Sequence, residues 1–378
     1  MWGRSIRLTR VAGIDIRLDA SWFLIAALLT WSLAEGYFPA LVPGTGPAEL
    51  LIAALISMLG LFGSLILHEL SHAMVARAYG MSVEGITLFV FGGVAELRNE
   101  PPDALTEFRV AIVGPLASLA IAAIFLMARW VAAAVGAADL AVAVLEYISL
   151  ANFVLAVFNL LPAFPLDGGR VLRAFLWRRS RDFAQATRTA DRISTGIALA
   201  MMTLGGIQIL WGAGAAGLWP VLLALFILAA SHSARLQTDM REALAGLTVR
   251  QVMRRDPISV DPDLTLAVLV EDVMMQNGIT FVAVVEDGQL LGIVDHETVR
   301  RIERENWAHT RVDDVFLALG PEDVVTPDVD ATDVFERMIR GDRRKFPVVT
   351  HGRLVGVVTL ADLMARGRLN TELGHSRG

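Results

Sequence analysis

The sequence lacks cysteine altogether: none occurs among its 378 residues. This absence excludes disulfide bonds, thiolate zinc ligands and a cysteine nucleophile. An excess of basic charge is lacking as well, because 39 Asp and Glu outnumber 33 Lys and Arg, and the net charge of −6 argues against a nucleic-acid partner. A metal site in this chain must therefore be built from histidine and carboxylate ligands.

Charge is also scarce between about residue 20 and residue 235, while residues 236–378 have the composition of a soluble domain. Six apolar segments in the first region reach or approach the roughly 20 residues that a helix needs to cross a bilayer. They cover residues 20–38, 50–78, 107–135, 141–162, 193–212 and 215–233. We therefore expect a mainly α-helical polytopic membrane protein with about six transmembrane helices, followed by a cytoplasmic α/β domain.

The placement of arginine predicts the orientation of these helices. The connections 39–49 and 212–219 contain no Lys or Arg, whereas arginines gather before the first span and after the second and fourth. Because positive loops stay on the cytoplasmic side, we expect both termini in the cytoplasm and the protein in the cell membrane. Arg129, near the outer end of the third span, is the one exception, and its long side chain can reach the lipid headgroups.

The second span contains the sequence His-Glu-Leu-Ser-His at residues 68–72. On a helix His68 and His72 share a face and can bind one ion, and Glu69 lies close enough to reach a water molecule on it. His68 precedes Arg77 by nine residues, which places the site roughly 13 Å below the cytoplasmic surface. The alternative is a pair of packed histidines without a metal, but ionisable groups inside a membrane are costly and usually functional.

A third ligand is expected where the fourth span ends, at Phe-Asn-Leu-Leu-Pro-Ala-Phe-Pro-Leu-Asp-Gly-Gly-Arg (158–170). The prolines and glycines break the helix and leave the Asp167 carboxylate free to point inward. Zinc bound by two histidines needs a third protein ligand and one open position, and Asp167 is the best-placed carboxylate. Alternatively Asp167 caps the helix that begins at Gly168. Its pairing with His68 and His72 favours the ligand.

Residues 85–97 predict a membrane-associated β-hairpin, because two short apolar runs flank Gly92-Gly93. An open strand edge cannot face lipid, so the hairpin must line a cavity or pack on helices. Phe91, Gly92 and Gly93 are candidate substrate-binding residues, since an edge strand can bind an extended substrate by strand addition. The alternative is a structural plug.

Two further patterns carry weaker information. Residues 6–18 alternate apolar and charged side chains, which fits either a strand at the membrane surface or a solvated arm. In the third span, Gly114-Pro115 with Ser118 predicts close helix packing and a kink.

The two-part motif, His-Glu-Leu-Ser-His with Asn159-x-x-Pro-x-x-Pro-x-Asp167-Gly168, resembles the site-2 protease family of intramembrane zinc metalloproteases. The resemblance covers roughly residues 1–235. It implies zinc ligands His68, His72 and Asp167, Glu69 as general base, and Asn159 as a residue that holds the substrate or polarises its carbonyl. It also implies single-span or membrane-anchored protein substrates, such as transcription-factor precursors, anti-sigma factors or signal-peptide remnants. No PDZ-like insertion is visible, so the chain is nearer to the branch with cytoplasmic CBS domains.

The C-terminal region repeats itself at 64–65 residues: residues 281–294 match 346–358, and Val260-Asp-Pro-Asp matches Val325-Thr-Pro-Asp. This resembles a tandem CBS pair, which implies an adenine nucleotide such as ATP or AMP, with Thr359 at the phosphate and Asp362 at the ribose. The first copy has Asp295 and Thr298 there, so we expect at most one good site. Alternatively the pair serves only in docking or as a homodimer contact.

We therefore predict four segments: an N-terminal arm (1–19), a transmembrane metalloprotease domain (20–235) and CBS repeats at 236–303 and 304–378. The alternatives are a CBS-regulated transporter and a zinc-binding membrane protein without proteolytic activity. The first is disfavoured because the intramembrane ionisable groups concentrate on His68, Glu69, His72 and Asp167, and the second because Glu69 is present. Other intramembrane proteases are disfavoured because Gly-x-Ser-Gly and Gly-x-Gly-Asp do not occur.

Overall fold

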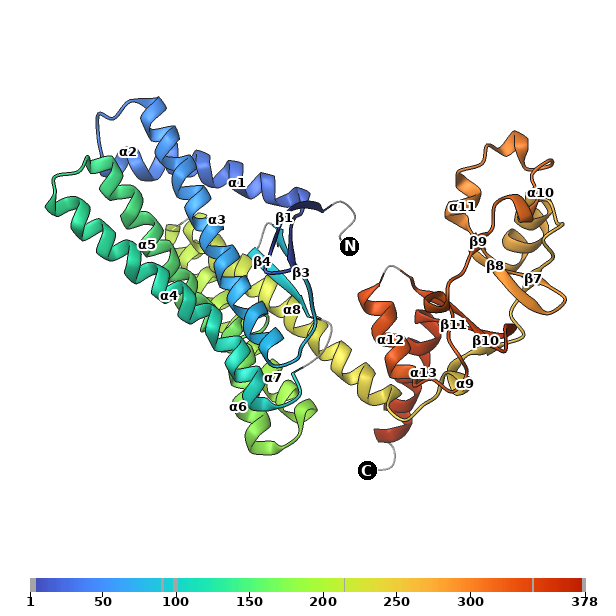
Figure 1. The fold of residues 1–378 in the computed structure, drawn as a ribbon. Helices are drawn as coiled ribbons and strands as arrows, with labels where there is room; N and C mark the ends of the chain where they lie inside the picture. Colours follow the sequence, from blue (N-terminus) through green and yellow to red (C-terminus); the bar gives the residue numbers. More distant parts are fainter. Residues whose placement is uncertain (1–4, 90–91, 98–100, 214, 342, 376–378) are drawn as a thin grey trace. The chain divides into compact units, whose positions relative to one another are not determined.

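The computed structural model describes residues 5–89, 92–97, 101–213, 215–341 and 343–375 (Figure 1). The chain separates into two compact units, Met1–Arg235 and Leu236–Gly378. The first unit holds most of the long helices and a small sheet, and the second is an α/β unit with a mainly antiparallel sheet.

Six helices among the described residues are long and apolar enough to cross a membrane, which confirms the predicted number of spans. The first combines α1 (Ala20–Ser32), a π-helical turn (Leu33–Tyr37) and α2 (Phe38–Leu41). The others are α3 (Pro47–Ala78), α4 (Ala104–Ala134), α5 (Asp139–Asn159), α7 (Phe183–Gln208, continued by a π-helical turn at Ile209–Ala213) and α8 (Ala215–Leu244).

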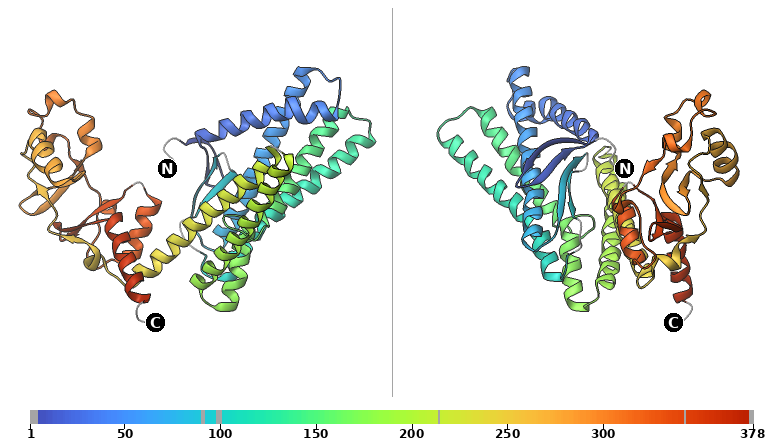
Figure 2. Two further views of the ribbon diagram at one scale, coloured as in Figure 1. Left: turned by 180° about the vertical axis from the view of Figure 1, so that it is seen from behind. Right: turned by 45° about the vertical axis from the view of Figure 1, so that its right-hand side comes forward.

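The helix of the fourth span begins and ends earlier than expected, at Asp139 rather than residue 141 and at Asn159 rather than residue 162. Residues 160–166 form a turn that contains Pro162 and Pro165, which cannot continue the hydrogen-bonding of a helix. A short helix follows, α6 (Asp167–Ser180), whose last turn carries Arg178 and Arg179. Helix α4 packs against α3, α5 and α6, and α4 and α5 run side by side in both views of Figure 2.

A four-stranded sheet in the order β1-β2-β3-β4 lies beside α3. Its strands are β1 (Ile6–Val11), β2 (Ile14–Leu18), β3 (Val83–Phe89) and β4 (Gly92–Leu97). The predicted hairpin is β3–β4, and residues 6–18 form a second hairpin rather than a solvated arm. The two hairpins join through parallel pairing of β2 with β3, and Ile14, Ile86 and Leu88 are buried against Phe62 of α3.

The second unit consists of two similar halves that share one sheet, in the order β10-β11-β8-β7-β6. The repeat predicted from sequence is visible in the register: Phe281 pairs with Asp295 in the first half, and Lys345 pairs with Thr359 in the second. The strands are β5 (Arg254–Arg255), β6 (Ser259–Val260), β7 (Phe281–Glu286), β8 (Gln289–Asp295), β9 (Leu317–Ala318), β10 (Lys345–Thr350) and β11 (Arg353–Thr359).

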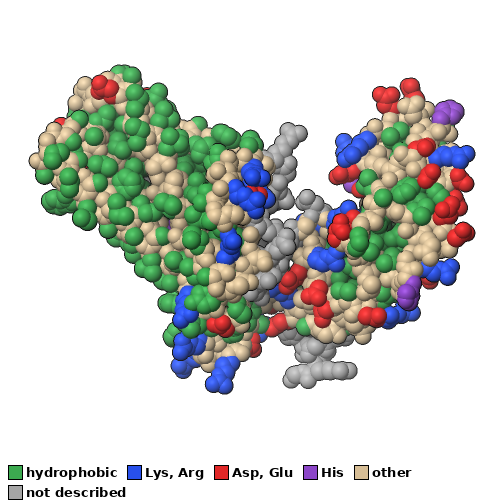
Figure 3. All heavy atoms as spheres, in the orientation of Figure 1, with side chains coloured by type: hydrophobic (Ala, Val, Ile, Leu, Met, Phe, Trp, Pro, Cys, Tyr) green, Lys and Arg blue, Asp and Glu red, His purple; other side chains and the backbone are tan. Residues whose placement is uncertain are grey.

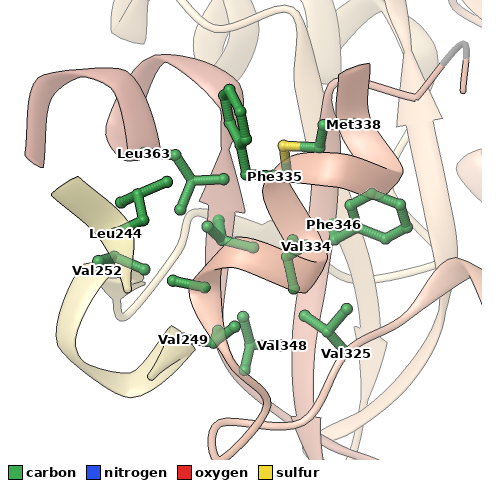
Figure 4. Packing of buried hydrophobic residues seen from close by; sticks show 12 residues of the cluster. Leu244, Val249, Val252, Val325, Val334, Phe335, Met338, Phe346, Val348 and Leu363 are labelled. Carbon is green, nitrogen blue, oxygen red and sulfur yellow. The ribbon is translucent and has the colours of Figure 1, made fainter. Parts of the chain in front are cut away.

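Each half of this unit has its own apolar core. The helices are α9 (Val249–Val252), α10 (Leu266–Val268), a π-helical segment (Leu269–Met275), α11 (His296–Arg300), α12 (Ala331–Arg340), α13 (Leu360–His375) and three short 3₁₀ turns (Arg304–Asn306, Val312–Asp314 and Pro321–Asp323). In the second half, Phe335 and Met338 of α12 and Leu363 of α13 are buried with Val348 of β10 (Figure 4). The first half buries Leu266, Val282 and Val294 in the same manner.

Candidate metal centre

Three side chains from two helices meet inside the first unit. His68 and His72 lie one turn apart on α3 and are 2% and 4% exposed, and Asp167 is the first residue of α6 and is 8% exposed. Asp167 Oδ2 lies 3.1 Å from His68 Nε2 and 3.2 Å from His72 Nε2, and the two Nε2 atoms are 3.2 Å apart. Tetrahedral ligands at the usual zinc bond lengths are roughly 3.3 Å apart, so the three atoms fit one zinc ion.

Helix α4 contacts both histidine rings at Nδ1, the nitrogen that does not face Asp167. His72 donates from Nδ1 to the backbone carbonyl of Val110 at 2.6 Å, because a carbonyl oxygen can only accept. His68 Nδ1 lies 2.9 Å from the hydroxyl oxygen of Ser118. With Nδ1 engaged in this way, the lone pair of His72 Nε2 faces Asp167, which is the arrangement that a metal-binding imidazole needs.

Gly114 of α4 leaves the space in which the ligand atoms meet. A β-carbon at this position would lie 2.1 Å from His72 Nε2 and 2.7 Å from His68 Nε2. No side chain fits there without displacing the rings. The sequence predicted close helix packing at Gly114, and the structure shows that the close partners are the two histidine side chains.

The hairpin lies directly against Glu69. A β-carbon at Gly93 of β4 would be 2.7 Å from Cγ and 3.2 Å from Cδ of Glu69, so the backbone of this strand touches the carboxylate arm. Gly92, with a φ of 133°, has open space where a side chain would be. Phe91, the third residue predicted to contact substrate, lies outside the described residues.

The turn before α6 presents Asp167 to the histidines. A β-carbon at Gly168 would lie 2.3 Å from the carbonyl oxygens of Leu160 and Leu161, so only glycine allows the turn to fold onto the helix start. The residue at the N-cap of α6 is Leu166, and no side-chain capping bond is formed. The capping role considered for Asp167 is therefore wrong, and its carboxylate contacts the two histidines instead.

Asn159 is placed differently from the other predicted residues. It is the last residue of α5 and half-buried, and its amide donates to the carbonyl of Leu155 on the same helix at 3.0 Å. The structure thus brings His68, Glu69, His72 and Asp167 to one place, with Gly93 beside Glu69, and gives the Asn159 amide a partner within its own helix.

The predicted nucleotide residues lie where β11 meets α13: Thr359 ends the strand, and Asp362 lies in the first turn of the helix. Thr359 donates to Asp362 Oδ2 through its hydroxyl at 2.6 Å, and Arg254 donates from Nε to Asp362 Oδ1 at 2.6 Å. In the first half, Asp295 accepts from the amide and the hydroxyl of Thr298 at 2.8 and 2.9 Å. Partial burial raises the pKa of Asp295, but the hydrogen bonds from Thr298 outweigh it and leave the pKa below its ordinary value. Asp295 is therefore negatively charged at neutral pH.

Comparison with known protein families gives two matches. The profile of Peptidase family M50 matches residues 56–134 and 127–203, and the profile of the CBS domain matches residues 249–305 and 317–368. The M50 profile covers the whole metal centre: His68 and His72 lie in its first matched range, and Asp167 lies in its second.

The chain is also similar to individual proteins from several organisms. A Mycobacterium tuberculosis protein named zinc metalloprotease Rip3 is 33% identical over 370 residues, covering 95% of this chain and 92% of the relative. A Synechocystis protein, also named as a zinc metalloprotease, is 30% identical and covers 95% of this chain and 94% of the relative. Among solved structures, the site-2 protease from Methanocaldococcus jannaschii is 31% identical, covers 61% of this chain and 95% of that one, and superposes with a TM-score of 0.41.

Proposed function

The chain belongs to Peptidase family M50, the site-2 type of zinc metalloprotease, and from this premise we propose that it cleaves membrane-anchored proteins at a zinc site made by His68, His72 and Asp167. The observation that carries the proposal is the meeting of their three ligand atoms within 3.1–3.2 Å of one another.

Each residue has a distinct task in the proposed reaction. A zinc ion bound there supplies Lewis-acid chemistry, lowering the pKa of water and polarising the peptide carbonyl. Glu69 takes a proton from the attacking water as the water oxygen forms a bond to the carbonyl carbon, and it then gives the proton to the leaving amine as the C–N bond breaks. Asn159 leaves its Leu155 carbonyl and donates its amide to the substrate carbonyl oxygen.

The substrate binds as an extended strand along β4. Two facts support this: β4 is the last strand in the order of the sheet, and Gly93 in it touches Glu69. A strand added there would form main-chain hydrogen bonds beside the general base, and we assign Phe91, Gly92 and Gly93 as the substrate-binding residues. The substrate helix must unwind locally to expose its peptide groups, since helical carbonyls are already hydrogen-bonded.

The protein is a multi-pass membrane protein, and we place it in the cell membrane with both termini in the cytoplasm. On the face shown in Figure 3, hydrophobic side chains make up much of the surface of the first unit, and Lys and Arg gather toward one end. The arginines of α6 belong to this end, which the positive-inside rule assigns to the cytoplasm. The metal centre, joined to the start of α6, is then nearer the cytoplasmic surface.

The CBS pair binds adenine nucleotide at the second half and regulates the protease. Thr359 faces the phosphate and Asp362 the ribose, while the ionised Asp295 repels phosphate from the first half. In this assignment the arm is residues 1–19, the protease domain 20–235, and the CBS repeats 236–303 and 304–378. A homodimer formed through the CBS pair is the second candidate role, supported by the repeat alone.

The test is comparative membrane proteomics of wild type and Glu69→Gln. The variant keeps the three ligands, so it should retain zinc while single-span proteins accumulate uncleaved. Glu35→Gln is the matched control, because Glu35 is an exposed carboxylate within the first span. Cleavage by Glu69→Gln at the wild-type rate would rule out the proposed mechanism.

A further inference from the structure

A buried ion pair links α4, which orients the two histidine rings, to α6, which carries Asp167. Glu107 lies in the first turn of α4 and its side chain is 0% exposed, and Arg173 of α6 is 14% exposed. Arg173 donates from Nε to Glu107 Oε1 at 2.8 Å, and its Nη2 donates to the same oxygen. Two donors of one planar guanidinium fix direction as well as distance.

Arg173 is also held by two aromatic rings. Its guanidinium carbon lies 5.2 Å from the ring centre of Phe164 and 4.7 Å from that of Phe183. Phe164 belongs to the turn that presents Asp167, and Phe183 begins α7. Arg173 therefore joins four segments at one point: α4, the turn, α6 and α7.

The ion pair thus connects the helix that orients the two histidines with the helix that supplies Asp167. Helix α4 fixes the histidines through Val110 and Ser118. Helix α6 begins with Asp167, six residues and roughly 9 Å of helix before Arg173. Any slide or rotation of α6 against α4 would move the Asp167 carboxylate relative to both Nε2 atoms.

Stability alone is a poor reason for this pair. Removing two charges from water costs free energy that their attraction often fails to recover, and apolar residues of similar volume are often as stable. Burial of Glu107 costs additional free energy, because its Oε2 is buried without a hydrogen-bond partner among the described residues. What apolar residues cannot replace is the directional contact between α4 and α6.

We infer that Glu107 and Arg173 are positioning residues that hold Asp167 at the distance from His68 and His72 at which the three side chains bind Zn²⁺. The inference rests on the proposed zinc site. It assigns a role to two charged residues that touch neither the ion nor the substrate.

The experiment compares Zn²⁺ dissociation constants of full-length variants in detergent, measured by competition with a chromogenic chelator. Glu107→Met combined with Arg173→Met removes the pair but fills its volume. We expect the metal-free double variant to melt at or above the wild-type temperature, and to bind Zn²⁺ roughly 10- to 100-fold more weakly, as when outer partners of a metal site are lost.

A matched control uses a second ion pair of α4. Arg129 donates to Glu146 of α5 at 2.9 Å in a half-exposed setting, so Arg129→Met with Glu146→Met should leave Zn²⁺ affinity unchanged. Arg173→Lys keeps the charge but not the two-donor geometry, and it should weaken Zn²⁺ binding in the same direction even if the apolar pair does not fold.

The outcomes separate this inference from the proposed site. If wild type binds Zn²⁺ no better than His68→Ala, the zinc site itself is wrong. If wild type binds Zn²⁺ and both Arg173→Lys and the apolar pair bind it equally well, the positioning role is overturned. Should the apolar pair not fold, Arg173→Lys alone decides: wild-type affinity in that variant overturns the role, and weakened affinity supports it.

Discussion

Gly114 and His72 are so close that a β-carbon on the glycine would lie 2.1 Å from the Nε2 of the histidine. Real β-carbons do not approach another atom so closely, so Gly114→Ala must displace either the helix or the ring. We expect this variant to fold but to lose Zn²⁺ affinity by at least about 100-fold, the upper end for a disturbed metal site. The zinc content of the purified variant, measured by mass spectrometry, tests this expectation.

The control for this prediction is Gly63→Ala. Gly63 lies in α3, the same helix as the histidines, and has no atom within 4 Å of its virtual β-carbon. Alanine there gains helix propensity of about 1 kcal/mol and should leave zinc content unchanged. Equal zinc content in both variants would show that the space beside His72 is not needed for the ion.

Ser118 should tune the metal through His68. Its hydroxyl lies 2.9 Å from His68 Nδ1, so Ser118→Ala removes the group that orients this ring. We expect Zn²⁺ affinity to fall roughly 10- to 100-fold while the melting temperature of the metal-free protein changes little. Ser149→Ala is the control, because buried Ser149 donates only to the backbone of Ala122. Chelator competition on both variants distinguishes them, and similar affinities would remove Ser118 from the metal centre.

Gly93 should separate zinc binding from catalysis. A methyl group at this position would lie 2.7 Å from Glu69 Cγ and would push the carboxylate away, but it does not face the ligand atoms. We expect Gly93→Ala to retain zinc and to lose proteolysis by roughly 100-fold, the effect of about 1 Å of misplacement in an active site. Cleavage of an accumulated substrate identified with Glu69→Gln supplies the assay. Undiminished cleavage would place β4 away from the reacting groups.

The residues of the metal centre differ in how far the sequence predicts them. His68, Glu69 and His72 are visible because a helix converts their spacing into a shared location. Asp167 is visible because cysteine is absent and prolines and glycines break the chain beside it. These patterns depend only on residues close together in the sequence, so they can be recognised without knowledge of the tertiary structure.

The sequence does not predict the roles of four residues of α4, because these roles arise only where α4 packs against α3 and α6. The four residues are Glu107, Val110, Gly114 and Ser118. The sequence does contain a trace of them: Val110, Gly114 and Ser118 recur every four residues, and Glu107 falls on the same face. The spacing of these residues does not indicate which helix packs against this face of α4. The parallel pairing of β2 with β3 was unpredictable for the same reason, since it joins strands separated by two spans' worth of chain.

Nucleotide binding at the CBS pair should depend on Asp362 far more than on other carboxylates of that unit. Titration of the full-length protein with AMP and ATP should show one class of site. Asp362→Ala removes the proposed hydrogen bond between this carboxylate and the ribose, and a hydrogen bond to a charged group contributes about 1.5–3 kcal/mol. AMP binding should therefore weaken by roughly 10- to 100-fold. Asp328→Ala is the control, because exposed Asp328 pairs only with exposed Arg250. Absence of binding by wild type at millimolar nucleotide would leave the docking role as the explanation of the pair.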